Sequence, residues 1–229
     1  MNILISDSVL ESMDREQITV AVLLDLSKAF DSIDHSLLLT KLPSLGFSDR
    51  AVDWFKSYLS GRSQIVRIGT TLSDSYFITH GVPLGPVLFN IYINDLSLVT
   101  NICSLESFVD DSKLYISFPV KDIDIDIVAG QLTEDLRRIA GWCCANSLLI
   151  NPHKTKLFLL GTRQMLRQIP DDIQVTLLGK QIYPVSSAQG LAKCANFAKI
   201  AKVTKIFLAS EKKTVTNSAR IPKGTRFKT

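Results

Sequence analysis

The nine residues from Ile18 to Leu26 are apolar apart from Thr19 and one acid, Asp25, next to the end of the run. A short apolar run rich in Val and Leu is typical of a buried strand. The chain is therefore expected to fold around a sheet, and one strand of that sheet is expected to carry Asp25 at its end.

Further elements are predicted by the spacing of apolar residues. Helical spacing predicts helices over about 3–15, 34–46, 48–61 and 122–146, and an apolar run of helical length covers 87–98. Shorter apolar segments predict strands over 64–68, 75–79, 103–109, 113–118 and 155–160, and a hairpin within 175–183. Strands separated by helix pairs indicate a sandwich with helices on one face of the sheet. The aromatic residues at helical spacing are expected in the core: Trp54, Phe55, Tyr58 and Trp142.

The net charge of +4 is divided unevenly along the chain. Residues 191–229 hold ten Lys or Arg and one acid, Glu211, a net charge of +9, while the other residues hold 16 basic and 21 acidic side chains, a net charge of −5. The basic segment has only a weak apolar pattern and is expected to be largely disordered. The remainder is long enough for one sizeable core.

Membrane and secreted classes are not favoured by the sequence. Asp7, Asp25 and Lys28 interrupt the early apolar runs, so no membrane span is expected, and the N-terminus does not resemble a signal peptide. The four cysteines show no Cys-x-x-Cys spacing and are too few for a disulfide framework. An intracellular protein is predicted, with no targeting signal to distinguish nucleus from cytoplasm.

Three segments carry residues suited to chemistry. Asp25 ends the buried strand, Asp110 and Asp111 form the tip of an apolar hairpin, and Lys154 lies in a turn before the strand at 155–160. Mg²⁺ prefers oxygen ligands and is held by one or two carboxylates together with substrate phosphates. Each segment can also be interpreted as having no role in chemistry. Asp is common at strand ends and in turns, and lysines in turns are commonly exposed to solvent.

Taken together with the residues around them, these segments resemble the reverse transcriptase domain of non-LTR (LINE-type) retrotransposons. The resemblance covers about 20–183 and rests on these strings, in the family's order: LLDLSKAFDSIDHSLLLTKL, SYLSGRSQIVRIG, HGVP, GPVLFNIYINDL, FVDDSKLY and WCCANSLLINPHKTKLFLLG. It implies an α+β fold, the palm of a right-hand polymerase, with an antiparallel sheet and helices packed on one face.

The resemblance also implies a metal site. Asp25 and Asp110 match the carboxylates that hold two Mg²⁺ ions, the carbonyl of Leu26 is expected to face an ion, and Asp111 matches the second acid of the hairpin. Asp25, Asp110, Asp111 and Lys154 are thus the expected catalytic residues, and Lys154 matches the lysine proposed to protonate the departing pyrophosphate.

Four further positions match nucleotide contacts of the family. Phe30 is similar to the aromatic residue that packs under the sugar and excludes a 2′-hydroxyl. Gly81, Val82 and Pro83 match the start of the loop that contacts the template and the incoming nucleotide.

The sequence departs from the family's pattern in three places. The nucleotide loop reads GVPLGPVLFNIYINDL where the family has GVPQGSxLGPxLFNIYINDL, so four residues that include Gln-Gly-Ser are missing. The chain begins about twenty residues before Asp25, and the family's pattern ends near residue 187. These departures predict incomplete fingers and thumb, a reverse transcriptase domain over 1–187 and a basic tail over 188–229.

The expected function is that of an RNA-directed DNA polymerase fragment that acts on an RNA template, a DNA primer and deoxynucleotides. Its activity is expected to be lost or impaired because of the shortened loop and the incomplete fingers. Two alternatives stay open: a non-catalytic remnant that binds nucleic acid through its basic tail, and a two-metal phosphohydrolase, which needs only the acids. The sequence does not predict an oligomeric state.

Overall fold

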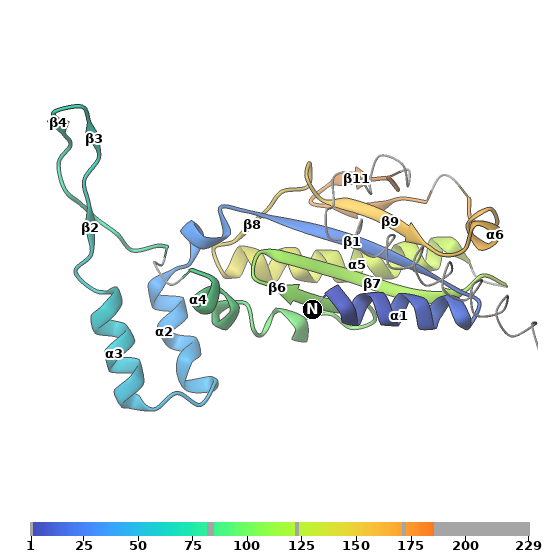
Figure 1. The fold of residues 1–229 in the computed structure, drawn as a ribbon, viewed down its shortest axis with the longest axis horizontal. Helices are drawn as coiled ribbons and strands as arrows, with labels where there is room; N and C mark the ends of the chain where they lie inside the picture. The colour runs from blue at the N-terminus through green and yellow to red at the C-terminus, as the bar shows by residue number, and fades with distance from the viewer. Residues whose placement is uncertain (1, 82–84, 122–123, 171–172, 186–229) are drawn as a thin grey trace, which may run out of the picture. The chain divides into compact units, whose positions relative to one another are not determined.

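The structure, a computed structural model, describes residues 2–81, 85–121, 124–170 and 173–185 (Figure 1). Val9–Val185 form one compact unit, and Met1–Ser8 are grouped with Ser186–Thr229 in another. The boundary expected at residue 187 and the predicted tail over 188–229 therefore lie outside the described residues. None of the described helices is long and apolar enough to cross a membrane.

The described helices are six α-helices and two short 3₁₀-helices. They are α1 (Asn2–Asp14), η1 (Ala29–Ser32), α2 (His35–Ser44), α3 (Asp49–Leu59), α4 (Gly85–Tyr92), η2 (Leu96–Leu98), α5 (Ile125–Ala145) and α6 (Arg163–Leu166). The helix expected over 87–98 ends at Tyr92 and is followed by a turn and η2, while η1 and α6 were not predicted. Asp34 and Ser48 cap α2 and α3 with their side chains, as their places before the apolar pattern indicate.

The strands form one main antiparallel sheet and three small pairs. They are β1 (Gln17–Ser27), β2 (Ser63–Gln64), β3 (Arg67–Ile68), β4 (Thr71–Leu72), β5 (Tyr76–Phe77), β6 (Ser104–Phe108), β7 (Asp111–Pro119), β8 (Leu149–Ile150), β9 (Lys156–Leu160), β10 (Val175–Leu177) and β11 (Lys180–Ile182). β1 is the central strand: β7 pairs along one edge, with β6 beyond it, and β9 and β8 pair along the other edge. The sheet expected from the sequence is confirmed.

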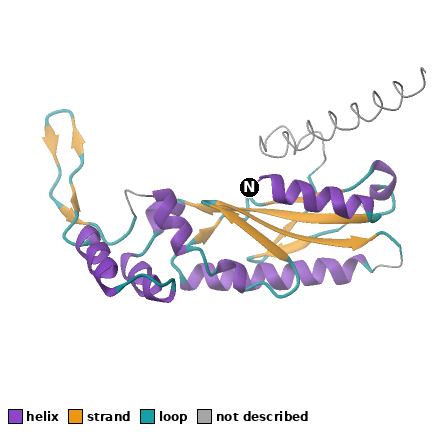
Figure 2. Ribbon diagram, turned by 60° about the horizontal axis from the view of Figure 1, so that its bottom comes forward, coloured by secondary structure: helices purple, strands orange, loops and turns teal. Residues whose placement is uncertain are grey.

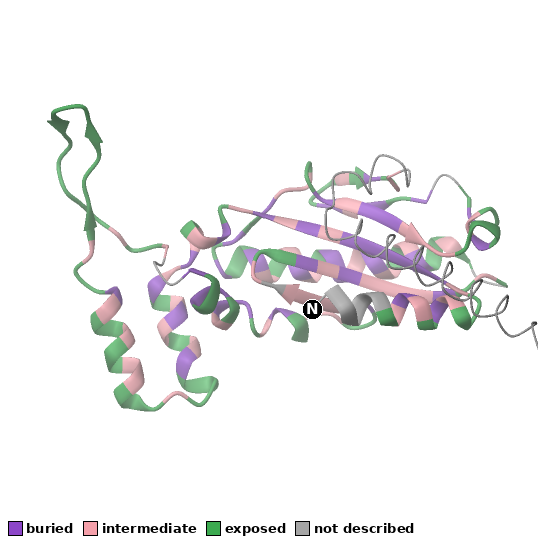
Figure 3. Cartoon of the chain, viewed as in Figure 1, coloured by how far each residue is buried: buried purple, intermediate pink, exposed green. Residues whose placement is uncertain are grey.

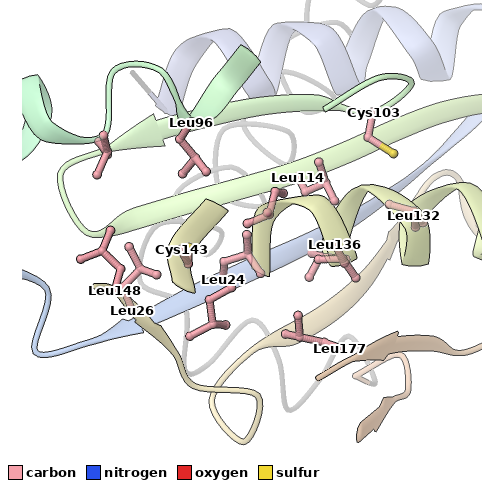
Figure 4. Packing of buried hydrophobic residues seen from close by; sticks show 14 of the residues in the cluster. Leu24, Leu26, Leu96, Cys103, Leu114, Leu132, Leu136, Cys143, Leu148 and Leu177 are labelled. Atoms are coloured by element: carbon pink, nitrogen blue, oxygen red, sulfur yellow. The ribbon is translucent and has the colours of Figure 1, made fainter. Parts of the chain in front are cut away.

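Helix α5 covers one face of this sheet (Figure 2). Alternate residues of β1, among them Leu24 and Leu26, belong to a single apolar cluster together with Leu132 and Leu136 of α5. Figure 4 shows these side chains meeting between the helix and the sheet. The α+β architecture with a helix packed on one sheet face is therefore confirmed.

The opposite face of the sheet is covered only in part. Thr19 of β1 and Ser117 of β7 share a hydroxyl hydrogen bond of 2.8 Å on that face, and Ser12 of α1 donates to Ser117 at 3.0 Å. Successive side chains of a strand point to opposite faces, so Asp25 shares the face of Thr19 and is opposite in direction to Leu24. Asp25 lies at the far end of β1 from this contact with α1, and its side chain is partly exposed.

The segment from α3 to β5 is the most exposed part of the described chain (Figure 3). Trp54 is 56% exposed and stacks on Tyr58 with a centroid separation of 5.4 Å. The prediction that Trp54 lies in the core is wrong, because α3 packs on α2 along one stripe and leaves Trp54 outside it. The strand expected over 64–68 is also divided, since Ile65 and Val66 lie between β2 and β3.

A charged junction joins α2 to α5 through the segment after α4. Lys41 donates to Asp95 at 2.7 Å and to the carbonyl of Tyr92 at 2.9 Å, and its ammonium lies 4.6 Å from the ring centroid of Trp142. Burial acts to raise the pKa of Asp95, but the hydrogen bond and charge of Lys41 hold that pKa below its ordinary value. The junction therefore connects the C-terminal end of α4 to α2 and the segment after it to α5.

Candidate active site

The register of the sheet brings two of the predicted acids together. Asp25 of β1 is the partner of Asp111 of β7, and facing residues of an antiparallel pair point to the same side of the sheet. Both therefore lie at the open face, opposite α5. The Oδ2 atom of Asp25 is buried and has no hydrogen-bond partner in the described part of the chain. Its neighbour of opposite charge is the ammonium of Lys154, whose Nζ atom lies 3.8 Å away, beyond hydrogen-bond distance. A buried carboxylate oxygen that accepts no hydrogen bond is costly, so this atom is suited to a cation.

Asp110 lies beside this pair, at the tip of the β6–β7 hairpin. Phe108 pairs with Asp111, so the loop contains only Val109 and Asp110. Val109 has φ of +56°, a left-handed conformation that costs a β-branched residue about 1–2 kcal/mol. The amide of Val109 donates to Oδ1 of Asn90 on α4 at 2.9 Å. Both Asp110 and Asp111 are exposed, as a site for a soluble substrate requires.

The turn that carries Lys154 is fastened to the end of β1. The backbone amide of Asn151 donates to the carbonyl of Asp25 at 2.8 Å, just beyond the pairing of Leu26 with Ile150. The side chain of Asn151 accepts from the amide of Lys154 at 3.3 Å, which closes the turn. As a result Nζ of Lys154 lies 3.8 Å from Oδ2 of Asp25.

The predicted nucleotide-binding residues Phe30 and Gly81 are also neighbours. Gly81 has φ of +79°, and a Cβ atom added to it would lie 3.5 Å from the carbonyl oxygen of Phe30. Its amide donates to the carbonyl of Ile33 at 2.9 Å, and its carbonyl oxygen lies 2.7 Å from Nε2 of His35. Val82 and Pro83 lie outside the described residues.

The ring of Phe30 is packed from the side of α4. Its centroid lies 5.5 Å from that of Phe89, and a Cβ atom on Gly85 would come within 3.0 Å of its Cδ1 atom. Gly85 thus permits the start of α4 to lie close against the aromatic ring. The first residues after the shortened loop are in this way part of the support of Phe30.

A magnesium ion fits this arrangement by the chemistry of the donors. Within the described residues, no three His, Cys, Asp or Glu side chains are gathered into a metal cluster. Mg²⁺ does not require such a cluster, because it keeps several waters and takes substrate phosphates as ligands beside one or two carboxylates. The Oδ2 atom of Asp25, which accepts no hydrogen bond in the described part of the chain, supplies that smaller set together with Asp110 and Asp111 at the neighbouring strand.

Sequence reasoning missed two asparagines that organise the site. Asn151 could have been found, because Asn before Pro is a common start of a turn. Asn90 carries no such signal, since its contact with Val109 depends on how α4 packs against the hairpin. Asn151 holds the backbone of the turn that carries Lys154, and Asn90 holds the backbone of the hairpin that carries Asp110.

The comparisons with known proteins show the family of this chain. The family model described as reverse transcriptase (RNA-dependent DNA polymerase) matches residues 4–207, which extends beyond residue 187. A probable RNA-directed DNA polymerase from transposon BS of Drosophila melanogaster is 29% identical over 64% of this chain and 17% of its own length. A Pol polyprotein from the type-1 retrotransposable element R2 of Popillia japonica is 27% identical over 72% of this chain and 28% of its own length.

One further curated protein and one solved structure are also similar to this chain. The RNA-directed DNA polymerase from the mobile element jockey of Drosophila funebris is 29% identical over 63% of this chain and 16% of its own length. Among solved structures, a telomerase from Candida tropicalis in complex with a fragment of telomeric RNA aligns with a TM-score of 0.49 at 11% identity, over 68% of this chain and 29% of that one. The chain thus spans less than a third of the length of each of these relatives.

Proposed function

The chain belongs to the family of reverse transcriptases, the RNA-dependent DNA polymerases, and we propose that its unit Val9–Val185 is a polymerase palm. Its relatives are polymerases of non-LTR retrotransposons. The reaction proposed is the addition of deoxynucleotides to the 3′ end of a DNA primer on an RNA template. The observation that carries the proposal is the buried Oδ2 atom of Asp25, which accepts no hydrogen bond in the described part of the chain, on the sheet face that Asp25 shares with Asp111.

The proposed metal ligands are Asp25, Asp110 and the carbonyl of Leu26, with Asp111 beside them. Two Mg²⁺ ions bound there would lower the pKa of the attacking hydroxyl and stabilise charge on the leaving phosphate. The sheet contributes rigidity: Asp25 and Asp111 are held at a fixed register by the long β1–β7 pairing. Carboxylates on rigid strands keep their geometry better than carboxylates on loops.

Two other side chains have proposed roles in the same reaction. The Lys154 ammonium, close to Asp25, would donate a proton to the departing pyrophosphate and balance its charge. Phe30, with Gly81 next to it and Phe89 behind it, would form the floor under the sugar of the nucleotide. An aromatic ring at that place leaves no room for a 2′-hydroxyl.

We further propose that the shortened loop impairs extension. The four absent residues belong to the segment between Gly81 and Gly85, both of which contact or approach Phe30. Loss of a positioning loop that places the nucleotide about 1 Å away from its productive position reduces the rate by about a hundredfold.

A primer-extension assay with Mg²⁺, an RNA template and a DNA primer tests both statements. The unchanged chain should extend weakly, insertion of Gln-Gly-Ser-Ala between Pro83 and Leu84 should raise the rate by about a hundredfold, and Asp110→Asn should abolish extension in the inserted chain. Robust extension by the unchanged chain would contradict the impairment. Extension that survives Asp110→Asn would contradict the proposed role of Asp110 as a metal ligand.

A second function is favoured by the charge of the tail. Residues 191–229 carry a net charge of +9, which suits non-specific binding to phosphates. If nucleic acid is bound through the tail, truncation after Gln189 should remove RNA binding together with its salt dependence. Unchanged RNA affinity in the truncated chain would place binding in the palm instead.

A further inference from the structure

The turn that carries Asp110 is conformationally demanding. Of its two loop residues, Val109 alone has a positive φ, and hairpins of this kind prefer Gly at that first position. Valine at φ +56° is retained only where surrounding contacts hold it. The contacts that hold Val109 therefore also determine where the next residue, Asp110, is placed.

The structure provides one hydrogen bond for that purpose. The amide of Val109 is not used in the ladder between β6 and β7, which closes at the pair Phe108–Asp111. It donates instead to Oδ1 of Asn90 at 2.9 Å. Because an amide N–H can only donate, the side-chain oxygen of Asn90, rather than its NH₂ group, must face the turn.

The helix that carries Asn90 is itself well fixed. Leu88 and Phe89 are almost fully buried on α4, and Phe89 packs against Phe30. The side chain of Val109 packs against the same apolar core. Asn90 itself is exposed, so burial of its amide cannot account for its contact with the turn.

We propose that Asn90 is a positioning residue, which holds the Val109–Asp110 turn so that Asp110 can share a divalent cation with Asp25. The inference rests on the proposed function of the site, but it concerns a different group: Asn90 does not touch the cation or the substrate. Its effect is transmitted through the backbone of Val109. The helix that begins beside the nucleotide loop is in this way connected to the metal-binding hairpin.

The test uses the full chain and two measurements. The first is the exchange rate of the Val109 amide hydrogen with solvent, measured by NMR. The second is the affinity for Mn²⁺, used as the probe in place of Mg²⁺ and followed by electron paramagnetic resonance. Asn90→Ala should accelerate exchange at Val109 and weaken Mn²⁺ binding by about threefold to tenfold, the effect of one lost hydrogen bond.

Three other variants separate positioning from general damage. Asn90→Asp keeps an acceptor oxygen and should restore slow exchange at Val109; its affinity for Mn²⁺ is not compared, because it adds a charge. Asn94→Ala removes an exposed asparagine just beyond α4 and should change neither measurement. Asn90→Leu, which also lacks an acceptor oxygen and favours a helix, replaces Asn90→Ala if the alanine variant fails to fold.

Asp110→Asn distinguishes failure of this inference from failure of the proposed function. If Asp110→Asn weakens Mn²⁺ binding but Asn90→Ala leaves it within twofold, the positioning role is refuted while the metal site stands. If Asp110→Asn has no effect on Mn²⁺, the proposed metal site fails. In that case the exchange rate of the Val109 amide hydrogen still tests whether Asn90 holds the turn. An unchanged exchange rate in Asn90→Ala would refute that role of Asn90.

Discussion

A buried carboxylate on α5 offers the sharpest test of how the hairpin is held in place. Asp135 is 1% exposed and accepts hydrogen bonds from the amides of Asn101, Ile102 and Cys103 at 3.0, 3.0 and 2.8 Å. These residues lead into β6, the first strand of the hairpin that carries Asp110. Replacement Asp135→Ala should therefore destabilise the fold at the entrance of that strand.

The magnitude follows from the exposure of the three donors. Cys103 is buried, so its amide loses its partner without access to water, at about 1–3 kcal/mol. Asn101 and Ile102 are exposed, so water can replace the carboxylate, and each lost bond contributes about 0.5–1.5 kcal/mol. Together these contributions lower the free energy of unfolding by about 4 kcal/mol, within a range of about 2–6 kcal/mol. A loss of about 4 kcal/mol lowers the melting temperature by roughly 8–16 °C in a domain of this size.

The pH dependence of this loss has a definite sign. Burial acts to raise the pKa of Asp135, but the three backbone hydrogen bonds outweigh it and hold the pKa below the ordinary value of 3.8. A carboxyl whose pKa is depressed by folding stabilises the protein fully above the unfolded pKa and loses that contribution as the pH falls through the folded pKa. The difference between the unchanged chain and Asp135→Ala should be constant from about pH 5 to 8 and decrease below about pH 4.

Urea unfolding at several pH values measures both effects. Asp53→Ala, on the exposed side of α3, is the matched control and should change stability by no more than about 0.5 kcal/mol. A loss below about 1 kcal/mol for Asp135→Ala would show that the three amides find other partners. A difference that persists unchanged at low pH would show that the charge of Asp135 is not what binds them.

Two further predictions concern the site and the thiols. Lys154→Met should raise the affinity for Mn²⁺ about twofold to fivefold at low salt, because it removes a cation that lies 3.8 Å from Oδ2 of Asp25; an equal affinity at low salt would show that the ion pair is not maintained in solution. Burial raises the pKa of both Cys103 and Cys143 to about 12, whereas Cys144 is exposed. Iodoacetamide at pH 8 should therefore label Cys144 well before the other two, as judged by peptide mass spectrometry, and equal labelling would contradict the packing around α5.

The sequence was informative about the strand that carries Asp25 and about the hairpin with Asp110, because both are short apolar runs ended by acids. The sequence alone could not predict the register in which β1 pairs with β7. Asp25 lies opposite Asp111 only in one alignment of β1 with β7, and a shift by one residue would turn one of them to the other face. The resemblance to a known family, rather than periodicity, was what placed these acids in one site.

Other features depend on tertiary packing and could not be predicted from local patterns. Trp54 has the spacing of a core residue but lies outside the stripe through which α3 contacts α2. The position of Lys154 next to Asp25 depends on one backbone hydrogen bond from Asn151. The contact of Asn90 with Val109 joins two elements that have no shared sequence signal.

The central place of β1 has a consequence for the order in which this protein is made. Its partners are distant in the chain: Thr19 and Ser117 lie 98 residues apart, and β9 is synthesised later still. During translation the apolar strand must wait, with both edges unpaired, until β7 and then β9 leave the ribosome. Sheets built from such distant pairs fold slowly and expose strand edges that aggregate. The Asp25 site is therefore expected to form only after most of the unit has been translated, because Asp25 meets Asp111 only through the pairing of β1 with β7.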